Sequence, residues 1–428
     1  MSRSILFVAY FYPPCPDAGA HRPAAMVKYL RRLGHRVTVL TTAAYGRGVD
    51  EPAGPTSPDA AGVVRTGDLQ LVRARLRGSD RVQGMYEADT YSGRPHPLSR
   101  VLVPEPLVLS WVPFALPRAL RLHRARRFDA VISTSPPESA HLIGRSLQRR
   151  GAAWVADVRD AWNFEPLRPA FPTRSQRRLD EWLERRLLGA ADVVTCVSHP
   201  AADDLQVRVG ATVEVVPNGW DPELAPPPGG PEELEAARLL DPERVSLVYT
   251  GRFGSYGRDP RPLIEALGRL AKSDPEVGSR LELVVAGPYT DAELELLGAD
   301  VAPARISVVG SLPRPAALAL QRAADALLLI ASPARSQLAN LKLFEYLVAG
   351  RPVLALAEGT EAGRIVAETG GEVARSDDVG AIARALGRLV QGEIPPPSSD
   401  RLREYSYPPV AEGMADVVER AIARRPYP

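Results

Sequence analysis

Short apolar runs, each followed by a loop and an amphipathic helix, recur through most of this 428-residue chain. The first run is Ile5–Tyr10 and the second is His35–Thr42, with a helix predicted between them at about Pro23 to Leu33. Such runs are typical of parallel strands buried on both faces, and parallel strands need a crossover helix between them. The pattern therefore predicts an α/β fold built from doubly wound sheets.

The alternation is interrupted by a proline- and glycine-rich segment, Pro226–Pro231, and then restarts. Later strands are predicted at Ser246–Thr250, Leu281–Ala286, Ile306–Val309 and Ala326–Ile330. A chain of this length exceeds one ordinary core. We expect two Rossmann-like domains, at 1–220 and 242–404, joined by a linker at 221–241. A last helix, at about 405–428, is expected to pack back on the first domain, and residues 43–100 are expected to form a long insertion.

The composition fits a globular enzyme or binding protein rather than a nucleic-acid-binding or disulfide-rich one. Apolar residues make up 45% of the chain, charged residues 24%, and the net charge is only +2. The two cysteines, Cys15 and Cys196, have neither zinc-site nor redox spacing. The start of the chain lacks a leader-like pattern, and the apolar stretch Val101–Leu120 contains Glu105, Arg118 and four prolines. We therefore expect a cytoplasmic location, no spanning helix and no nucleic-acid partner.

Basic residues cluster in two segments, Arg118–Arg127 and Arg174–Arg186, which both carry interleaved leucines. This pattern predicts solvated helix faces, with contact to a membrane surface or an anionic acceptor as the alternative. Only three of the 53 basic residues are lysine, namely Lys28, Lys272 and Lys342. A surface ion pair in this chain would more often use arginine, which makes Lys342 conspicuous.

Lys342 lies in a segment with the pattern strand, loop, short helix, strand. The apolar run Ala326–Ile330 is followed by a loop, Asn340 suits an N-cap, and Gly350 suits the residue after the helix. Lys342 is then in the first turn, where the helix dipole disfavours a cation, and Glu345 shares its face. A cation beside free N–H groups suits a diphosphate, and a carboxylate one turn later suits paired hydroxyls. An ordinary surface Lys–Glu pair is the alternative.

Two further features are placed where ligands of α/β sheets bind, at the carboxyl ends of strands. Asp160 follows the predicted strand Trp154–Val158, and the glycine-rich loop Gly251–Arg258 follows the first strand of the second domain. The first domain lacks a G-x-G-x-x-G fingerprint, so we do not expect a tightly bound dinucleotide there. With two such domains, function is expected in a cleft between them.

Several segments, in this order along the chain, resemble the nucleotide-sugar glycosyltransferases of GT-B fold, specifically the retaining family 4 group. They are Phe11–Pro14 with Gly19 and Arg22, Leu33–Thr41, Ser133–His141, Asp157–Trp162, Val216–Asp221, Thr250–Arg252, Ala286–Gly287, Val309–Gly310 and Lys342–Val353. The resemblance implies two Rossmann-like domains facing a central cleft. It implies an acceptor-binding N-terminal domain and a C-terminal domain that binds the nucleotide sugar.

The implied activity is transfer of a hexose from a UDP- or dTDP-linked sugar to a hydroxyl of a small molecule, a saccharide or a lipid-linked glycan. The resemblance implies retention of configuration, and neither a metal nor a cofactor beyond the nucleotide sugar. For a lipid-linked acceptor, we expect peripheral contact with the inner face of a membrane.

The resemblance also assigns roles to residues of the second domain. Glu345 matches the second of two glutamates eight positions apart, which in relatives holds the ribose hydroxyls, while Gln337 stands where the first is expected. Lys342 and Arg252 match residues near the diphosphate and are implied to be catalytic. Arg258, or alternatively Arg261, stands near a position where relatives have lysine. The remaining donor-binding residues are Gly19, Gly251, Gly287, Gly310, Ser311, Leu312 and Leu341.

In the first domain, Asp160 is our candidate for a catalytic base, with capping of a helix or pairing to Arg159 as the alternative. Retaining relatives need no fixed protein nucleophile, because the leaving phosphate oxygen can accept the acceptor's proton. The acceptor-binding candidates are Tyr12, His21, His141 and Trp162.

Two other functions keep the same fold. One is a nucleotide-sugar epimerase, which needs further acid–base residues that the sequence does not place. The other is a non-catalytic partner subunit, a reading that Gln337 favours because an amide carries no charge.

Overall fold

The structure is a computed structural model, and it forms two compact units. It describes residues 2–15, 18–44, 62–69, 102–105, 107–160, 162–164, 171–223, 229–254, 258–339 and 341–425. Unit 1 comprises Met1–Asn218 together with Tyr407–Pro428, and unit 2 comprises Gly219–Ser406.

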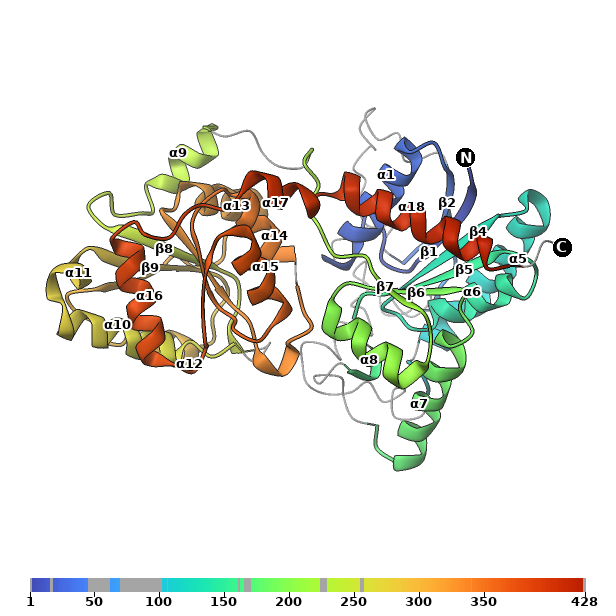
Figure 1. Ribbon diagram of the computed structural model, residues 1–428, viewed down its shortest axis with the longest axis horizontal. Coiled ribbons are helices and arrows are strands. Elements are labelled where there is room, and N and C mark those ends of the chain that lie inside the picture. Colours follow the sequence, from blue (N-terminus) through green and yellow to red (C-terminus); the bar gives the residue numbers. More distant parts are fainter. Residues whose placement is uncertain are drawn as a thin grey trace. The chain divides into compact units, whose positions relative to one another are not determined.

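Unit 1 is built on a seven-stranded parallel sheet with the strand order β3-β2-β1-β4-β5-β6-β7 (Figure 1). Its strands are β1 (Ser4–Ala9), β2 (Arg36–Thr42), β3 (Val63–Thr66), β4 (Ala130–Ser135), β5 (Ala153–Val158), β6 (Val193–Cys196) and β7 (Val213–Val215). Its helices are α1 (His21–Arg32), α4 (Leu107–Ser110), α5 (Val112–Arg126), α6 (Ala140–Gln148), α7 (Arg174–Leu188), α8 (His199–Val209) and α18 (Tyr407–Ala423), with 3-10 turns η1 (Ala18–Ala20) and η2 (Trp162–Phe164).

The central strand β1 shows why both faces of this sheet are covered. All six of its residues are buried, and successive side chains point to opposite faces. Ile5 and Phe7 join the core that α1 and α18 cover, while Leu6 and Val8 join the core that α5, α6, α7 and α8 cover. The last helix of the chain therefore belongs to the core of unit 1.

Unit 2 repeats the plan with a six-stranded parallel sheet of order β10-β9-β8-β11-β12-β13. Its strands are β8 (Val245–Thr250), β9 (Leu281–Ala286), β10 (Arg305–Val308), β11 (Ala326–Ile330), β12 (Val353–Leu356) and β13 (Glu372–Ala374). Its helices are α9 (Pro231–Ala237), α10 (Arg261–Ser273), α11 (Pro275–Ser279), α12 (Asp291–Leu297), α13 (Arg314–Ala323), α14 (Leu341–Val348), α15 (Glu361–Thr369), α16 (Val379–Val390) and α17 (Ser399–Glu404), with the 3-10 turn η4 (Pro333–Arg335).

The two faces of this second sheet are also covered. Helices α10 and α16 pack against Leu247 and Tyr249 of β8, and α13, α14 and α15 share the opposite core with Val248. Both units are thus doubly wound α/β layers, which confirms the predicted fold class.

The main local difference from expectation lies in the predicted linker, since part of 221–241 forms α9. Pro231 occupies the first turn and Glu232 and Glu233 complement the helix dipole, so a strong helix start follows the prolines and glycines. The expected Asn340 cap and most of the expected insertion at 43–100 lie outside the described residues. In the part of the chain that the structure describes, no helix has both the length and the apolar character to cross a bilayer.

Candidate functional site

The carboxyl ends of β8 and β11 lie side by side in unit 2, because the two strands pair in parallel. The chain leaves β8 through Gly251, and it leaves β11 through η4 into α14. Tyr346 of α14 ties the two together, since its hydroxyl accepts a 2.8 Å hydrogen bond from the Thr250 amide. The first turn of α14 is therefore held against the loop that follows β8.

Lys342 projects from this first turn into a buried position. Its Nζ lies 4.3 Å from the centroid of the Tyr249 ring, a cation–π distance. Among the described residues, no atom accepts a hydrogen bond from the buried Nζ. Burial lowers the pKa of Lys342 to about 7, with a further lowering by Arg258 and a smaller opposing effect of Glu345. The site thus holds a partly desolvated amine to which the described part of the chain offers no hydrogen-bond acceptor.

Two glycines make room for this amine. Gly251 has φ +119°, which L side chains rarely adopt, and a Cβ there would collide with the Lys342 Nζ. A Cβ on Gly287, at the end of β9, would collide with the carbonyl oxygen of Gly251. Both predicted glycines therefore allow the backbone at Gly251 to lie close to the Lys342 side chain.

Glu345 lies one turn beyond Lys342 and is engaged by an arginine from α13. Its Oε1 is 2.7 Å from a guanidinium nitrogen of Arg314. Burial raises the pKa of Glu345, and Arg314 and then Lys342 oppose that rise. A sequence argument from spacing alone misses Arg314, which lies 31 positions away along the chain.

The other predicted donor residues of unit 2 lie in loops at the carboxyl ends of its strands or in the first turn of α14. The Arg252 side chain is exposed, while its carbonyl accepts hydrogen bonds from the Tyr249 hydroxyl (2.6 Å) and from Arg258 (3.2 Å). Gln337 is buried in the loop before α14. Gly310 follows β10 with φ +84°. Three further residues lie in these loops and in the first turn of α14, namely Ser311, Leu312 and Leu341.

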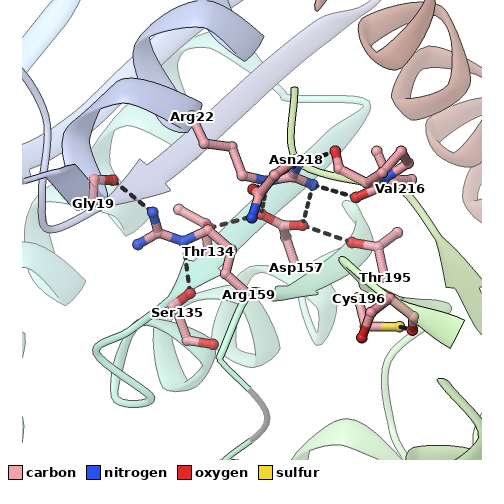
Figure 2. A network of polar contacts seen from close by, with 12 residues as sticks. Gly19, Arg22, Thr134, Ser135, Asp157, Arg159, Thr195, Cys196, Val216 and Asn218 are labelled. Atoms are coloured by element: carbon pink, nitrogen blue, oxygen red, sulfur yellow. Dashed lines mark hydrogen bonds and ion pairs between the residues drawn. The ribbon is translucent and has the colours of Figure 1, made fainter. Parts of the chain in front are cut away.

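Unit 1 contains a buried ion pair between Arg22 and Asp157. In the sequence, these two residues stood out only as members of the segments that resemble family 4. Arg22 Nη2 lies 3.1 Å from Asp157 Oδ1, and both side chains are at most 5% exposed (Figure 2). Asp157 also accepts hydrogen bonds from Thr134 (2.7 Å) and Thr195 (3.0 Å). Arg22 donates further to the carbonyls of Val216 and Pro217. The sequence signal that could have revealed this ion pair is a charged residue inside an otherwise apolar strand, Asp157 in β5.

The residues after β5 form the predicted acceptor side. Arg159 donates to the carbonyls of Gly19 (2.6 Å) and Ser135 (2.8 Å), which joins the loop before α1 to the end of β4 (Figure 2). Asp160 is half-buried, and its carbonyl accepts a 2.7 Å hydrogen bond from the Trp162 amide. The geometry holds the Asp160 backbone in a tight turn at the edge of the sheet.

His141 and Trp162 stack on each other inside the core of unit 1, with ring centroids 6.2 Å apart. His141 Nδ1 lies 2.9 Å from Ser133 Oγ, and burial lowers the pKa of His141 to about 4, so the ring is neutral at pH 7. Tyr12 is buried as well, and His21 begins α1 half-buried. Contact of these four residues with an acceptor stays a prediction.

The described residues contain no group of three or more histidine, cysteine, aspartate or glutamate side chains placed to hold a metal ion. The charged side chains at the carboxyl ends of the unit 2 strands include Arg252, Arg258, Arg314 and Lys342, together with the carboxylates of Glu293 and Glu345.

Comparison with known proteins bears on both units. A model described as Glycosyltransferase Family 4 matches residues 23–224, and one described as Glycosyl transferases group 1 matches residues 244–392. A D-inositol 3-phosphate glycosyltransferase of Salinispora tropica is 29% identical over 260 residues, which cover 56% of this chain and 53% of that protein. The chain thus matches about half the length of this curated relative.

Two solved structures share the fold at low identity. A sucrose-phosphate synthase from Thermosynechococcus elongatus superposes with a TM-score of 0.57 at 16% identity, covering 99% of this chain and 100% of that one. The N-terminal domain of a Candida albicans trehalose-6-phosphate phosphatase superposes with a TM-score of 0.63 at 13% identity, covering 98% and 97%. These similarities extend over essentially the whole chain.

Proposed function

The chain belongs to the GT-B glycosyltransferases of the family 4 type, and from this premise we propose that it transfers a sugar from a nucleoside diphosphate sugar to a hydroxyl acceptor. The observation that carries the proposal is Lys342, whose buried Nζ has no hydrogen-bond acceptor among the described residues. An amine held this way costs free energy until an anion binds it. A diphosphate at the edge of the unit 2 sheet supplies that anion.

The diphosphate is bound by groups that also favour its departure. Lys342 and the first-turn amides of α14 offer charge-assisted hydrogen bonds, and Arg252 and Arg258 add positive charge to the same edge. As the sugar–phosphate bond breaks, negative charge grows on the diphosphate. Cations fixed beforehand stabilise that charge more than they stabilise the ground state. This arrangement takes the role that a divalent ion has in other glycosyltransferases, so we propose transfer without a metal.

Glu345 is proposed to accept hydrogen bonds from the ribose hydroxyls of a UDP- or dTDP-linked donor. One of its oxygens pairs with Arg314, and a carboxylate has further lone pairs to offer. Gln337, where relatives of this type carry a glutamate, offers a neutral amide to the sugar. We propose that this substitution sets which hexose is accepted.

The proposed reaction balances without an added base. The bond from the anomeric carbon to the phosphate oxygen breaks, and the acceptor oxygen bonds to that carbon on the same face, with retention. The acceptor's proton passes to the leaving phosphate oxygen, or to Asp160 if unit 1 brings it to the acceptor. The products are a nucleoside diphosphate and a glycoside.

The test is incubation with a panel of UDP- and dTDP-sugars, with and without hydroxyl acceptors, while released nucleotide is measured. Release that requires an acceptor supports the proposal. Interconversion of sugars without net release identifies an epimerase instead, and neither outcome across the panel identifies a non-catalytic partner. The variant Lys342→Met should release little nucleotide. The control is Lys272→Met, which replaces an exposed lysine of α10 and should leave the release unchanged.

A further inference from the structure

Helix α7 of unit 1 has two faces with opposite chemistry. Its inner face is buried and carries Asp180 and Glu184, spaced one turn apart. Asp180 accepts a 3.1 Å hydrogen bond from the Trp162 indole, and Glu184 pairs with Arg208 and accepts from Asn163. Both carboxylates are thus buried and hydrogen-bonded inside the protein, and that of Glu184 is neutralised by Arg208. They add little negative charge to the outer face.

The outer face of α7 is basic and also apolar. Trp182 is 52% exposed and Leu179 is 47% exposed. Three exposed arginines surround them at helical spacing, namely Arg178, Arg185 and Arg186. In the part of the chain that the structure describes, none of these three makes an ion pair. Burying Trp182 and Leu179 against a partner would remove apolar surface from water, so this face has a reason to bind.

The positive charge continues over the neighbouring helices. Helix α6 contacts both α5 and α7, and the sequences of α5 and α6 contain no acidic residue. The pKa of Arg145 on α6 is lowered by its burial and then by nearby Arg149 and Arg186, which shows how closely like charges gather here. The third acidic residue of α7, Glu181, is paired with Arg177 at 2.9 Å. Asp192 acts in the opposite direction on Arg145 and pairs with Arg425, and within the described part of this side the arginines on the outer face of α7 remain without an ion pair.

We propose that the outer face of α7, continued by Arg145 and Arg149 at the end of α6, docks on an anionic phospholipid bilayer. Arginines are attracted to the negative surface, while an amphipathic ring such as Trp182 and an aliphatic side chain such as Leu179 enter the headgroup boundary. A soluble polyanion would satisfy the charge but would leave Leu179 in water. The inference goes beyond the proposed activity, because binding to vesicles needs no turnover.

The test is co-sedimentation of the full chain with vesicles at 50 mM and 500 mM NaCl. Vesicles of phosphatidylcholine with 30% phosphatidylglycerol are compared with vesicles of phosphatidylcholine alone. We expect binding only to the anionic vesicles and release at 500 mM, where screening shortens the range of the attraction. Each arginine contributes roughly fivefold in partitioning, so the triple variant Arg178→Gln, Arg185→Gln, Arg186→Gln should lose on the order of 100-fold.

The apolar part is tested with brominated phosphatidylglycerol, which quenches indoles that enter the bilayer. Quenching should occur in the wild type and disappear in Trp182→Phe, since Trp111, Trp154 and Trp162 are fully buried. The fifth tryptophan, the half-buried Trp220, packs against the core of unit 2 and is not part of α7. Val207→Ser, which alters an exposed apolar residue of α8, and the exposed pair Arg401→Gln, Arg403→Gln of α17 are matched controls and should bind normally.

Four results would overturn the proposal: no binding to anionic vesicles at 50 mM NaCl, equal binding to neutral vesicles, wild-type binding by the triple variant, or absence of Trp182 quenching. Capture by heparin with the same loss in the triple variant, but without vesicle binding, identifies a polyanion site instead. Thermal melting of each variant confirms folding. An unfolded triple variant is replaced by the single substitution Arg178→Gln, for which about a fivefold loss is expected.

Discussion

Replacing Lys342 by methionine should stabilise the free protein. Methionine keeps the length and flexibility of the side chain and makes a favourable contact with the ring of Tyr249. If the whole shift counts, a lysine pKa that falls from 10.5 to about 7 on folding lowers the free energy of unfolding by about 5 kcal/mol. Because the protein and water around a buried charge rearrange and screen it, we expect a smaller gain of about 2 kcal/mol at pH 7. For a unit of this size, that gain raises the melting temperature by about 4–8 °C.

The difference in stability between the methionine variant and the wild type should depend on pH. Between pH 7 and pH 10.5 the unfolded chain binds the Lys342 proton and the folded chain does not, so stability of the wild type rises with pH across this window. The methionine variant lacks that rise. Its advantage should therefore be largest at pH 7 and small near pH 10.

The same substitution should weaken binding of UDP and dTDP by about 1.5–3 kcal/mol, or roughly 10- to 150-fold. In the wild type, we expect a bound diphosphate to raise the pKa of Lys342, so binding above pH 7 should take up a proton and should weaken as pH rises. Isothermal titration at pH 8 in two buffers of different ionisation enthalpy measures this uptake, and Lys342→Met should abolish it. Lys272→Met, on the exposed side of α10, should change neither quantity. A methionine variant that is less stable at pH 7, or that binds UDP normally, would refute the reasoning.

Four other outcomes follow from the two units. Gly287→Ala should cost about 1–3 kcal/mol and weaken UDP binding, because its Cβ displaces Gly251; unchanged UDP titrations would contradict this. Asp157→Asn should cost about 3–5 kcal/mol in urea unfolding, since it strands a buried guanidinium. The pKa of His141 falls from 6.5 to about 4 on folding. The free energy of unfolding of the wild type should therefore fall by about 2 kcal/mol more between pH 7 and pH 5 than that of His141→Gln. Asp160→Asn should abolish transfer with near-normal nucleotide binding; full activity would remove its proposed role.

The fold was predictable because parallel strands buried on both faces leave a local mark. Strands β9 and β11 have the predicted bounds, Leu281–Ala286 and Ala326–Ile330. The elements that prediction missed include α8, whose first residue His199 was assigned to a loop, and several short ones. Strand β13 has three residues at the edge of its sheet, and α12 is a seven-residue helix with one buried residue. Their sequences carry little periodic signal, and tertiary packing decides them.

The candidate site was predictable only where its residues are close in sequence. Lys342 and Glu345 share a helix face three positions apart, which spacing reveals. The partners that define their chemistry are distant: Arg314 comes from α13, and the Tyr249 ring comes from β8. The desolvation that lowers the pKa of Lys342 is likewise a property of the packed unit, and no window of sequence contains it.

Helix α7 shows how one element can serve two functions without conflict. Its inner carboxylates hold the turn that follows Asp160, and its outer face carries the proposed membrane contact around Trp182. Residues 180 and 182 lie about 200° apart on a helix, so their side chains share no contacts. Substitutions at Arg178 and Asp180 should therefore separate the two functions. The first should weaken vesicle binding with melting unchanged, and Asp180→Asn should lower stability while vesicle binding of the folded protein persists.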